Sequence, residues 1–141
     1  MPPAARAYRS KTLAAWLAVL VGTLGLHRLY VHGARDVLAW LHPLPTALGA
    51  YGVLRMRALG QDDRLAWLLI PLLGLILAQA MLTAIVWALT PDEKWNHRHN
   101  PGQAVVASGW GAVLASIAAL MLGGIALTAT IAFTIEKFLE L

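Results

Sequence analysis

The chain has no cysteine and few charged residues. Because disulfides, thiolate metal sites and thiol catalysis all need cysteine, its absence excludes the three together. Charged residues make up only 13% of the 141 residues, and hydrophobic residues make up 59%. In an average soluble domain roughly a quarter of the residues are charged. The chain is therefore far more apolar than a soluble domain of its length.

The few charges are clustered and leave four long intervals without Asp, Glu, Lys or Arg. A helix needs about 20 mostly apolar residues to cross the hydrocarbon core of a bilayer. The first interval is short for a span unless Lys11 and Arg28 extend their side chains to the two interfaces. We therefore predict an all-α polytopic integral membrane protein with four transmembrane helices in an antiparallel bundle. The intervals are Thr12–His27, Val37–Leu54, Leu65–Pro91 and His99–Ile135.

The spacing of these intervals divides the chain into four parts. Residues 1–11 form a basic arm, and residues 12–57 form a helical hairpin whose first helix is expected over 12–31. Residues 58–64 form a polar loop, and residues 65–141 form a second helical pair with an interfacial loop over 90–102. No small-residue cleavage site follows the first apolar run, so we expect an uncleaved first helix. We find no internal repeat.

The distribution of Lys and Arg near the spans predicts the orientation. With four spans, seven of these residues fall on the side of the N-terminus and four on the other, so both termini are expected in the cytoplasm. The net charge of +4 and the pI near 10.0 then reflect arginines at an anionic membrane surface and not a nucleic-acid partner. The seven are Arg6, Arg9, Lys11, Arg55, Arg57, Arg64 and Lys137.

The usual catalytic patterns are missing from the sequence. There is no nucleophile elbow, no zinc-protease helix motif, no phosphate-binding loop and no dinucleotide fingerprint. The apolar intervals hold no Asp, Glu, Lys or Arg, whereas pumps and transporters keep ionisable groups near mid-membrane. We therefore expect neither an enzyme nor a cofactor, and a proton-coupled transporter is disfavoured.

The last apolar interval carries a small-residue stripe in which each member follows the previous one by four residues. Small side chains at this spacing let two helix backbones approach closely inside a membrane. We expect the stripe to pack within the bundle or against another copy of the chain. Its members are Ala107, Gly111, Ala115, Ala119 and Gly123.

The end of the first apolar run combines a glycine pair with a His-Arg-x-Tyr cluster. Ser10-Lys11-Thr12, Gly22-x-x-Gly25 and His27-Arg28-x-Tyr30 resemble the bacterial branch of the TM-two (two-transmembrane) domain family. The resemblance covers residues 9–57 and implies a helical hairpin in a bacterial cytoplasmic membrane, extended here by a second pair. The chain departs from the family pattern at Leu29, where the family has an aromatic residue, and at His32, where it usually has glycine. The motif and hairpin residues are Gly22, Gly25, His27, Arg28, Tyr30, Gly33 and Asp36.

Three polar groupings have two interpretations each. The guanidinium of Arg28 could bind a lipid phosphate, or it could pair with Asp36 across the hairpin. His27 and His42 could be axial ligands of a haem. Alternatively, His27 could belong only to the turn motif, and His42 could bind a backbone carbonyl that the nearby prolines leave without a donor. Glu93, His97 and His99 could bind a divalent metal, or they could lie in a solvated loop.

These observations favour a non-enzymatic membrane protein, an interaction or accessory subunit that self-associates or docks onto a membrane complex. Its expected partners are the lipid bilayer and a second copy or another membrane protein. The alternatives are a bis-histidine electron carrier and, less favoured by the lack of intramembrane charge, a small channel or transporter.

Overall fold

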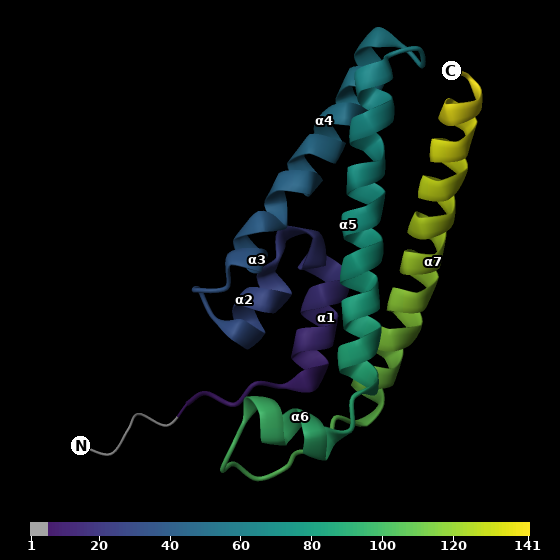
Figure 1. Cartoon of the computed structure of the whole chain (residues 1–141). Coiled ribbons are helices and arrows are strands. Elements are labelled where there is room, and N and C mark those ends of the chain that lie inside the picture. Colours follow the sequence, from purple (N-terminus) through teal and green to yellow (C-terminus); the bar gives the residue numbers. More distant parts are fainter. Residues whose placement is uncertain (1–5) are drawn as a thin grey trace.

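The computed structural model describes residues 6–141, and all regular structure in that part of the chain is helical (Figure 1). The expected all-α architecture is confirmed. Three of the described helical segments are long and apolar enough to cross a membrane: Val37–Leu59, Arg64–Leu89 and Gly109–Leu139. The elements are α1 (Lys11–Val21), the 3-10 turn η1 (Gly22–Leu24), α2 (Leu26–His32), α3 (Val37–Leu41), α4 (Pro43–Leu59), α5 (Arg64–Leu89), α6 (Asp92–His99) and α7 (Gly109–Leu139).

The first predicted span, residues 12–31, is wrong as a single helix. α1 ends at Val21, and η1 then reverses the chain so that α2 runs back beside α1 (Figure 1). Gly25 has φ +78° and ψ 5°. This left-handed conformation costs a residue with a side chain about 1–2 kcal/mol, so it favours glycine. The sequence prediction placed Gly22 and Gly25 near the end of one continuous helix, whereas they form the reversal.

α3 and α4 together form one 23-residue apolar segment. The boundary between α3 and α4 lies at His42, which keeps a helical backbone with φ −58° and ψ −41°. Pro43 stands at the start of α4, where the missing N–H of proline is best tolerated.

The three long segments form a layer with α5 in the middle and α4 and α7 on either side of it (Figure 1). Glycines bring the helix axes close together. A Cβ atom added to Gly52 of α4 would lie 2.7 Å from Cβ of Leu69, and one added to Gly123 of α7 would lie 2.7 Å from Cβ of Met81. Close approach of backbones is how helices gain packing energy in lipid.

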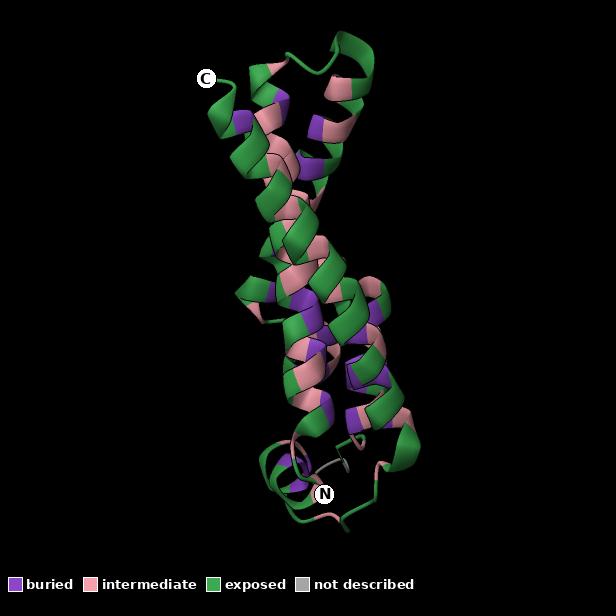
Figure 2. Cartoon of the chain, turned by 90° about the vertical axis from the view of Figure 1, so that its right-hand side faces the viewer, coloured by how far each residue is buried: buried purple, intermediate pink, exposed green. Residues whose placement is uncertain are grey.

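α1 packs between α5 and α7 and covers only part of the length of these two helices. Its buried face is made of Ala14, Ala15, Ala18 and Val19, and it meets alanines of both neighbours. Figure 2 shows these buried positions as a strip along the inner faces of the helices. The larger core cluster contains Ala18, Val19, Ala80, Met81, Ala84 and Ala119, and the smaller one contains Ala15, Ala88, Ala112 and Ala115.

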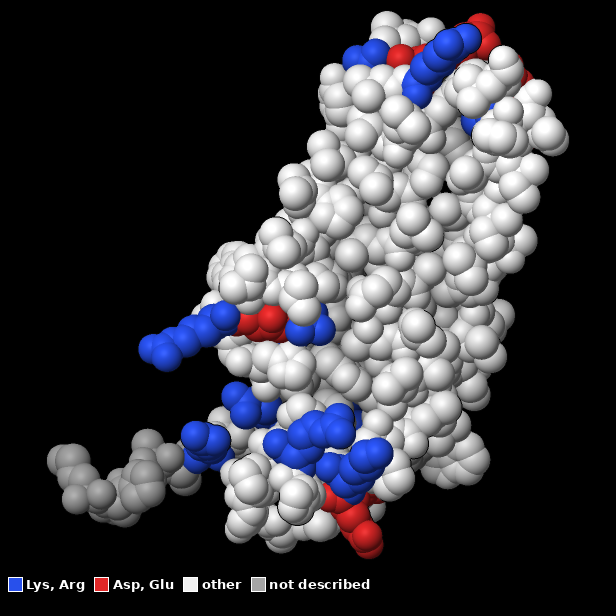
Figure 3. Space-filling view, in the orientation of Figure 1, with Lys and Arg blue, Asp and Glu red and all other residues white. Residues whose placement is uncertain are grey.

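Charged side chains gather at the two ends of the long axis and at the α2–α3 turn (Figure 3). On the face shown, the surface between them carries no Lys, Arg, Asp or Glu. The described chain enters beside α6, whereas Leu141 lies at the opposite end of the long axis (Figure 1). Both termini were expected on one side of the membrane, and this arrangement does not support that expectation.

Candidate functional site

One ion pair closes the turn between α2 and α3. Nε of Arg28 lies 2.8 Å from Oδ2 of Asp36, and Oδ1 of Asp36 accepts the N–H of Leu38. Asp36 therefore caps α3 while it binds α2. The indole of Trp40 donates to the carbonyl of Ala34 at 2.8 Å. Of the two interactions considered for Arg28, the structure shows the ion pair with Asp36.

The turn between α4 and α5 is built in the same way. Arg55 makes two hydrogen bonds to the carboxylate of Asp63, at 2.7 and 2.9 Å. The hydrogen bond from Arg55 holds the pKa of Asp63 below its usual value. The indole of Trp67 donates to the carbonyl of Gln61 at 2.6 Å. Arg28 with Asp36, and Arg55 with Asp63, are called the two clamps below.

The two turns belong to an internal repeat, so the expectation of no repeat is wrong. Residues 22–41 align without gaps with residues 49–68, an offset of 27, and nine of the 20 positions are identical. Within the His27-Arg28-Leu29-Tyr30 cluster only Arg28 recurs, as Arg55, so the repeat is visible mainly in the spacing of the glycines and in the residues after each turn. The identical pairs are Gly22/Gly49, Gly25/Gly52, Arg28/Arg55, Gly33/Gly60, Asp36/Asp63, Leu38/Leu65, Ala39/Ala66, Trp40/Trp67 and Leu41/Leu68.

The repeated glycines Gly33 and Gly60 have a structural role at the turns. Gly33 and Gly60 have φ values of +85° and +96°, with ψ near 180°, a region that is essentially restricted to glycine. The two clamps lie at opposite ends of the 23-residue segment formed by α3 and α4 (Figure 1). Such a segment is about 34 Å long, which is close to the thickness of a bilayer hydrocarbon core.

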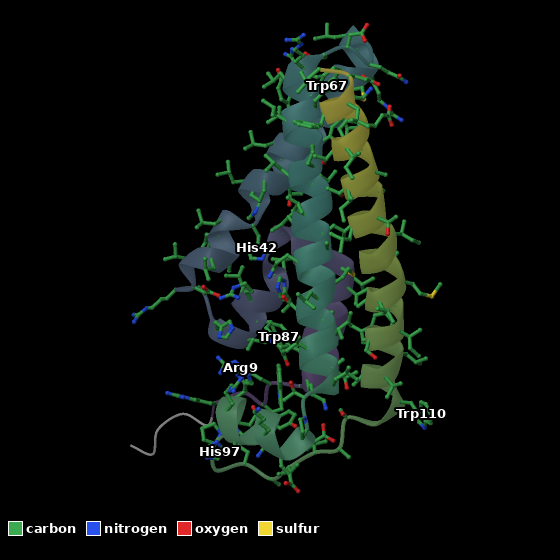
Figure 4. All side chains as sticks on the ribbon, turned by 45° about the vertical axis from the view of Figure 1, so that its right-hand side comes forward. Arg9, His42, Trp67, Trp87, His97 and Trp110 are labelled. Atoms are coloured by element: carbon green, nitrogen blue, oxygen red, sulfur yellow. The ribbon has the colours of Figure 1, made fainter. Side chains whose placement is uncertain are left out.

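His27 and His42 are brought together, as the sequence suggested. The ring centroids lie 5.4 Å apart, with the rings edge to face, and His27 lies at the same distance from the ring of Trp87 (Figure 4). His42 Nδ1 lies 2.6 Å from the carbonyl oxygen of Leu38, and its Nε2 lies 3.2 Å from Gln79 Oε1. His27 is fully buried, and neither ring nitrogen has a partner among the described residues.

This geometry does not favour the haem interpretation. Axial ligation requires the two imidazoles to face each other across a flat macrocycle. Here His27 and His42 touch through a ring edge, and Gly25 packs against the carbonyl of Ala39 beside them. The described residues leave no slot for a macrocycle between the rings.

Lys11, a buried lysine at the start of α1, binds residues at the junction between α5 and α6. Lys11 Nζ lies 2.7 Å from Oδ1 of Asp92 and donates to the carbonyl of Thr90 at 2.6 Å, and Lys11 is only 7% exposed. The other oxygen of Asp92 accepts the N–H of Ser108 at 3.2 Å. Hydrogen bonding from Lys11, opposed by burial, lowers the pKa of Asp92. The sequence prediction assigned Lys11 to the basic arm and missed this contact.

The described part of the N-terminal arm is held by α6 and the residue after it. Asn100 is fully buried, accepts the N–H of Arg9 at 2.7 Å and donates to the Arg9 carbonyl at 3.0 Å. The indole of Trp95 donates to the same carbonyl at 2.8 Å. The hydroxyl of Tyr30, on α2, accepts the N–H of Ser10. The arm therefore joins α2 to α6.

The proposed metal ligands on α6 do not converge. Glu93 and His97 are exposed, whereas the ring centroid of His99 lies 4.2 Å from that of Trp95. The described residues contain no group of three or more potential ligands able to hold a metal ion. Glu93 and His97 are one turn apart, but His99 turns toward Trp95 and His32.

The surroundings of His32 and His99 are electropositive. Their ring centroids lie 6.1 Å apart. Burial, and then the nearby guanidinium of Arg28, lowers the pKa of His32. Burial also lowers the pKa of His99, with further contributions from His32, Arg98 and Arg9. The pKa of each imidazole is therefore lowered first by partial burial and then by the cations nearby.

The small-residue stripe of the last helix packs inside the chain. Ala115 and Ala119 are fully buried against α1 and α5, and Gly123 meets Met81. The carbonyl of Gly111 accepts the indole N–H of Trp16. Ala107 differs from the expectation, because it is exposed and lies in the loop before α7.

Comparisons with models of known families, with curated proteins and with solved structures found no match. The resemblance to the TM-two family therefore depends on the motif at residues 10–30.

Proposed function

We propose that this protein is a non-enzymatic integral membrane protein, an interaction subunit that binds a transmembrane helix of a membrane partner in a groove between α5 and α7. The observation that carries the proposal is the early end of α1. α1 occupies the lower part of the groove between these helices and stops at Val21, and the groove continues beyond it.

The continuation of the groove has a volume of about 380 Å³. Leu77 lies at its lower end and also packs against the core cluster that contains Ala18 and Val19 of α1. A second helix entering from the opposite end would therefore extend an interface that α1 already makes. The groove is lined by Ile70, Pro71, Leu73, Gly74, Leu77, Ala126, Ala129, Thr130 and Phe133.

The chemistry of this α5–α7 groove fits a transmembrane helix. Its lining has no charged residue, and the hydroxyl of Thr130 already donates to the carbonyl of Ala126. Ala126 and Ala129 are small enough to let another backbone approach closely. The stripe from Gly111 to Gly123 is occupied inside the chain, so the groove replaces it as the candidate contact with a partner.

The same proposal includes a membrane topology. We place Val37–Leu59, Arg64–Leu89 and Gly109–Leu139 across the bilayer, with α1 and α2 as a re-entrant hairpin that enters and leaves on one side. Non-helical backbone at membrane depth is tolerated where protein buries it, and Gly22 and Gly25 are buried. The clamps and the indoles of Trp40 and Trp67 then mark the two interfaces.

With three spans, the balance of basic residues still places the N-terminus in the cytoplasm, but the C-terminus now lies on the other side of the membrane. Seven Lys and Arg residues lie on the side of the N-terminus and four on the side of the C-terminus, so the N-terminal side is cytoplasmic. The TM-two resemblance supports a bacterial cytoplasmic membrane. The seven are now Arg6, Arg9, Lys11, Arg28, Arg35, Lys94 and Arg98, and the four are Arg55, Arg57, Arg64 and Lys137.

Photo-crosslinking in native membranes tests the partner helix. A diazirine amino acid is placed at Ala129, which lines the groove, and at Ile131, which is 50% exposed on the same helix and lies outside the groove. We expect Ala129 to yield one defined adduct with a polypeptide, and Ile131 to yield mainly lipid adducts.

The mass of the adduct identifies the partner. An adduct of twice the chain mass shows self-association, and another recurrent mass shows a different subunit. Lipid adducts alone at Ala129 would contradict the proposed function.

A further inference from the structure

Two adjoining hollows lie at the end of the molecule that holds α6 and the N-terminal arm. They share three lining residues, His32, Arg98 and His99. The first has a volume of about 800 Å³ and also presents Arg6 and Arg9. The second has a volume of about 380 Å³ and continues toward α5. Together they are called the basic groove.

The basic groove has an excess of positive charge that the described chain does not balance. Neither hollow is lined by Asp or Glu. Arg28 borders the second hollow and is paired with Asp36. Arg9 donates from Nε to the uncharged carbonyl of Tyr30. Basic side chains cover this part of the surface in Figure 3. Guanidinium groups gathered in this way are suited to a phosphate.

The second hollow is lined by both basic and apolar side chains. Arg28, His32, Arg98 and His99 supply the basic and imidazole groups, and Leu82, Val86 and Trp87 of α5 supply the apolar ones. Leu82 and Val86 are 61% and 56% exposed on a membrane-spanning helix, where their surroundings would be lipid chains. A ligand that fits has an anionic head and a long apolar chain joined to it.

We propose that the basic groove binds an anionic phospholipid, with its phosphate at Arg98, Arg6 and Arg9 and one acyl chain along Leu82 and Val86. His32 and His99 lie beside the phosphate position and can donate a hydrogen bond as neutral imidazoles. The bound lipid connects the N-terminal arm, α2, α5 and α6. It would hold the re-entrant hairpin against α5 from the headgroup side.

Native mass spectrometry of the full-length protein in detergent tests this site. The probes are phosphatidylglycerol, phosphatidylcholine and inorganic phosphate. We expect phosphatidylglycerol to bind more tightly than phosphatidylcholine. The Arg98→Gln variant should weaken phosphatidylglycerol binding about fivefold, since a basic residue near an anionic lipid contributes on the order of 1 kcal/mol.

Arg57→Gln is the matched control, because Arg57 is an exposed arginine at the opposite end of the molecule. Arg6→Gln is the second variant, because only the backbone carbonyl of Arg6 makes a hydrogen bond in the fold. Equal losses in the Arg98 and Arg57 variants would overturn the site. So would equal affinity for the two lipids, and displacement of phosphatidylglycerol by millimolar phosphate would assign the groove to free phosphate instead.

Discussion

Gly25 determines the direction of the N-terminal third of the chain. Its positive φ reverses the backbone, and its missing side chain lets the carbonyl of Ala39 approach. The sequence contains this glycine at a spacing that also suits helix packing, so its role could not be told from the residue alone. The pairing of Arg28 with Asp36, by contrast, was one of two interpretations that the sequence offered, because both residues flank one short turn.

Replacing Gly25 with alanine should lower the free energy of unfolding by at least about 1–2 kcal/mol. The left-handed backbone alone accounts for this amount, and the added Cβ would also collide with the Ala39 carbonyl. Thermal unfolding in detergent, followed by circular dichroism, measures the loss. Gly124→Ala is the control, since Gly124 is helical with open space around it. Equal unfolding midpoints for the two variants would contradict the role of Gly25.

Among the elements, the long apolar helices were predictable and the short ones were not. α5 and α7 follow from charge-free intervals that exceed the length of a span. α1, η1 and α2 share one interval, and its hydropathy does not show the reversal, which is made by the positive φ of Gly25 and the packing of α2 beside α1. The tie between α1 and α6 joins residues far apart in sequence, so no local pattern predicts it.

The Lys11→Met variant should lose about 1–3 kcal/mol of stability at neutral pH. The substitution removes the hydrogen bonds from Lys11 to the Thr90 carbonyl and to Oδ1 of Asp92, and the loss of a hydrogen bond that involves a charged group costs about this much. Thermal unfolding measures the change. Lys94→Met is the control, because Lys94 is exposed. A loss of the same size in the control would contradict the role of the Lys11 contact.

The same contact predicts how stability depends on pH. The folded pKa of Asp92 lies below its unfolded value near 3.8, so the folded state binds fewer protons there. The contribution of Asp92 is complete above about pH 4 and is lost as the pH falls through the folded pKa. The unfolding midpoint of the wild type should therefore fall more steeply below pH 4 than that of Lys11→Met. Parallel curves would exclude this contact as the cause.

At the scale of the whole molecule, the internal repeat sets the arrangement. The two clamps recur at an offset of 27 residues and face opposite ends, with one 23-residue segment between them. The number of spans could not be predicted from hydropathy alone, because a re-entrant hairpin and a short span have the same composition. The repeat was present in the sequence as nine identical positions, and it makes the α2–α3 turn the structural equivalent of the α4–α5 turn.

Single-cysteine labelling in sealed membrane vesicles tests the three-span topology most directly, since the natural chain has no cysteine. Cysteine is placed at Ala7, Ala34, Gln61 and Leu141, and an impermeant maleimide is added from one side at a time. The account predicts that positions 7 and 34 react from one side, and positions 61 and 141 from the other. Reaction of positions 7, 61 and 141 from a common side, with 34 alone on the opposite side, would show four spans and contradict it.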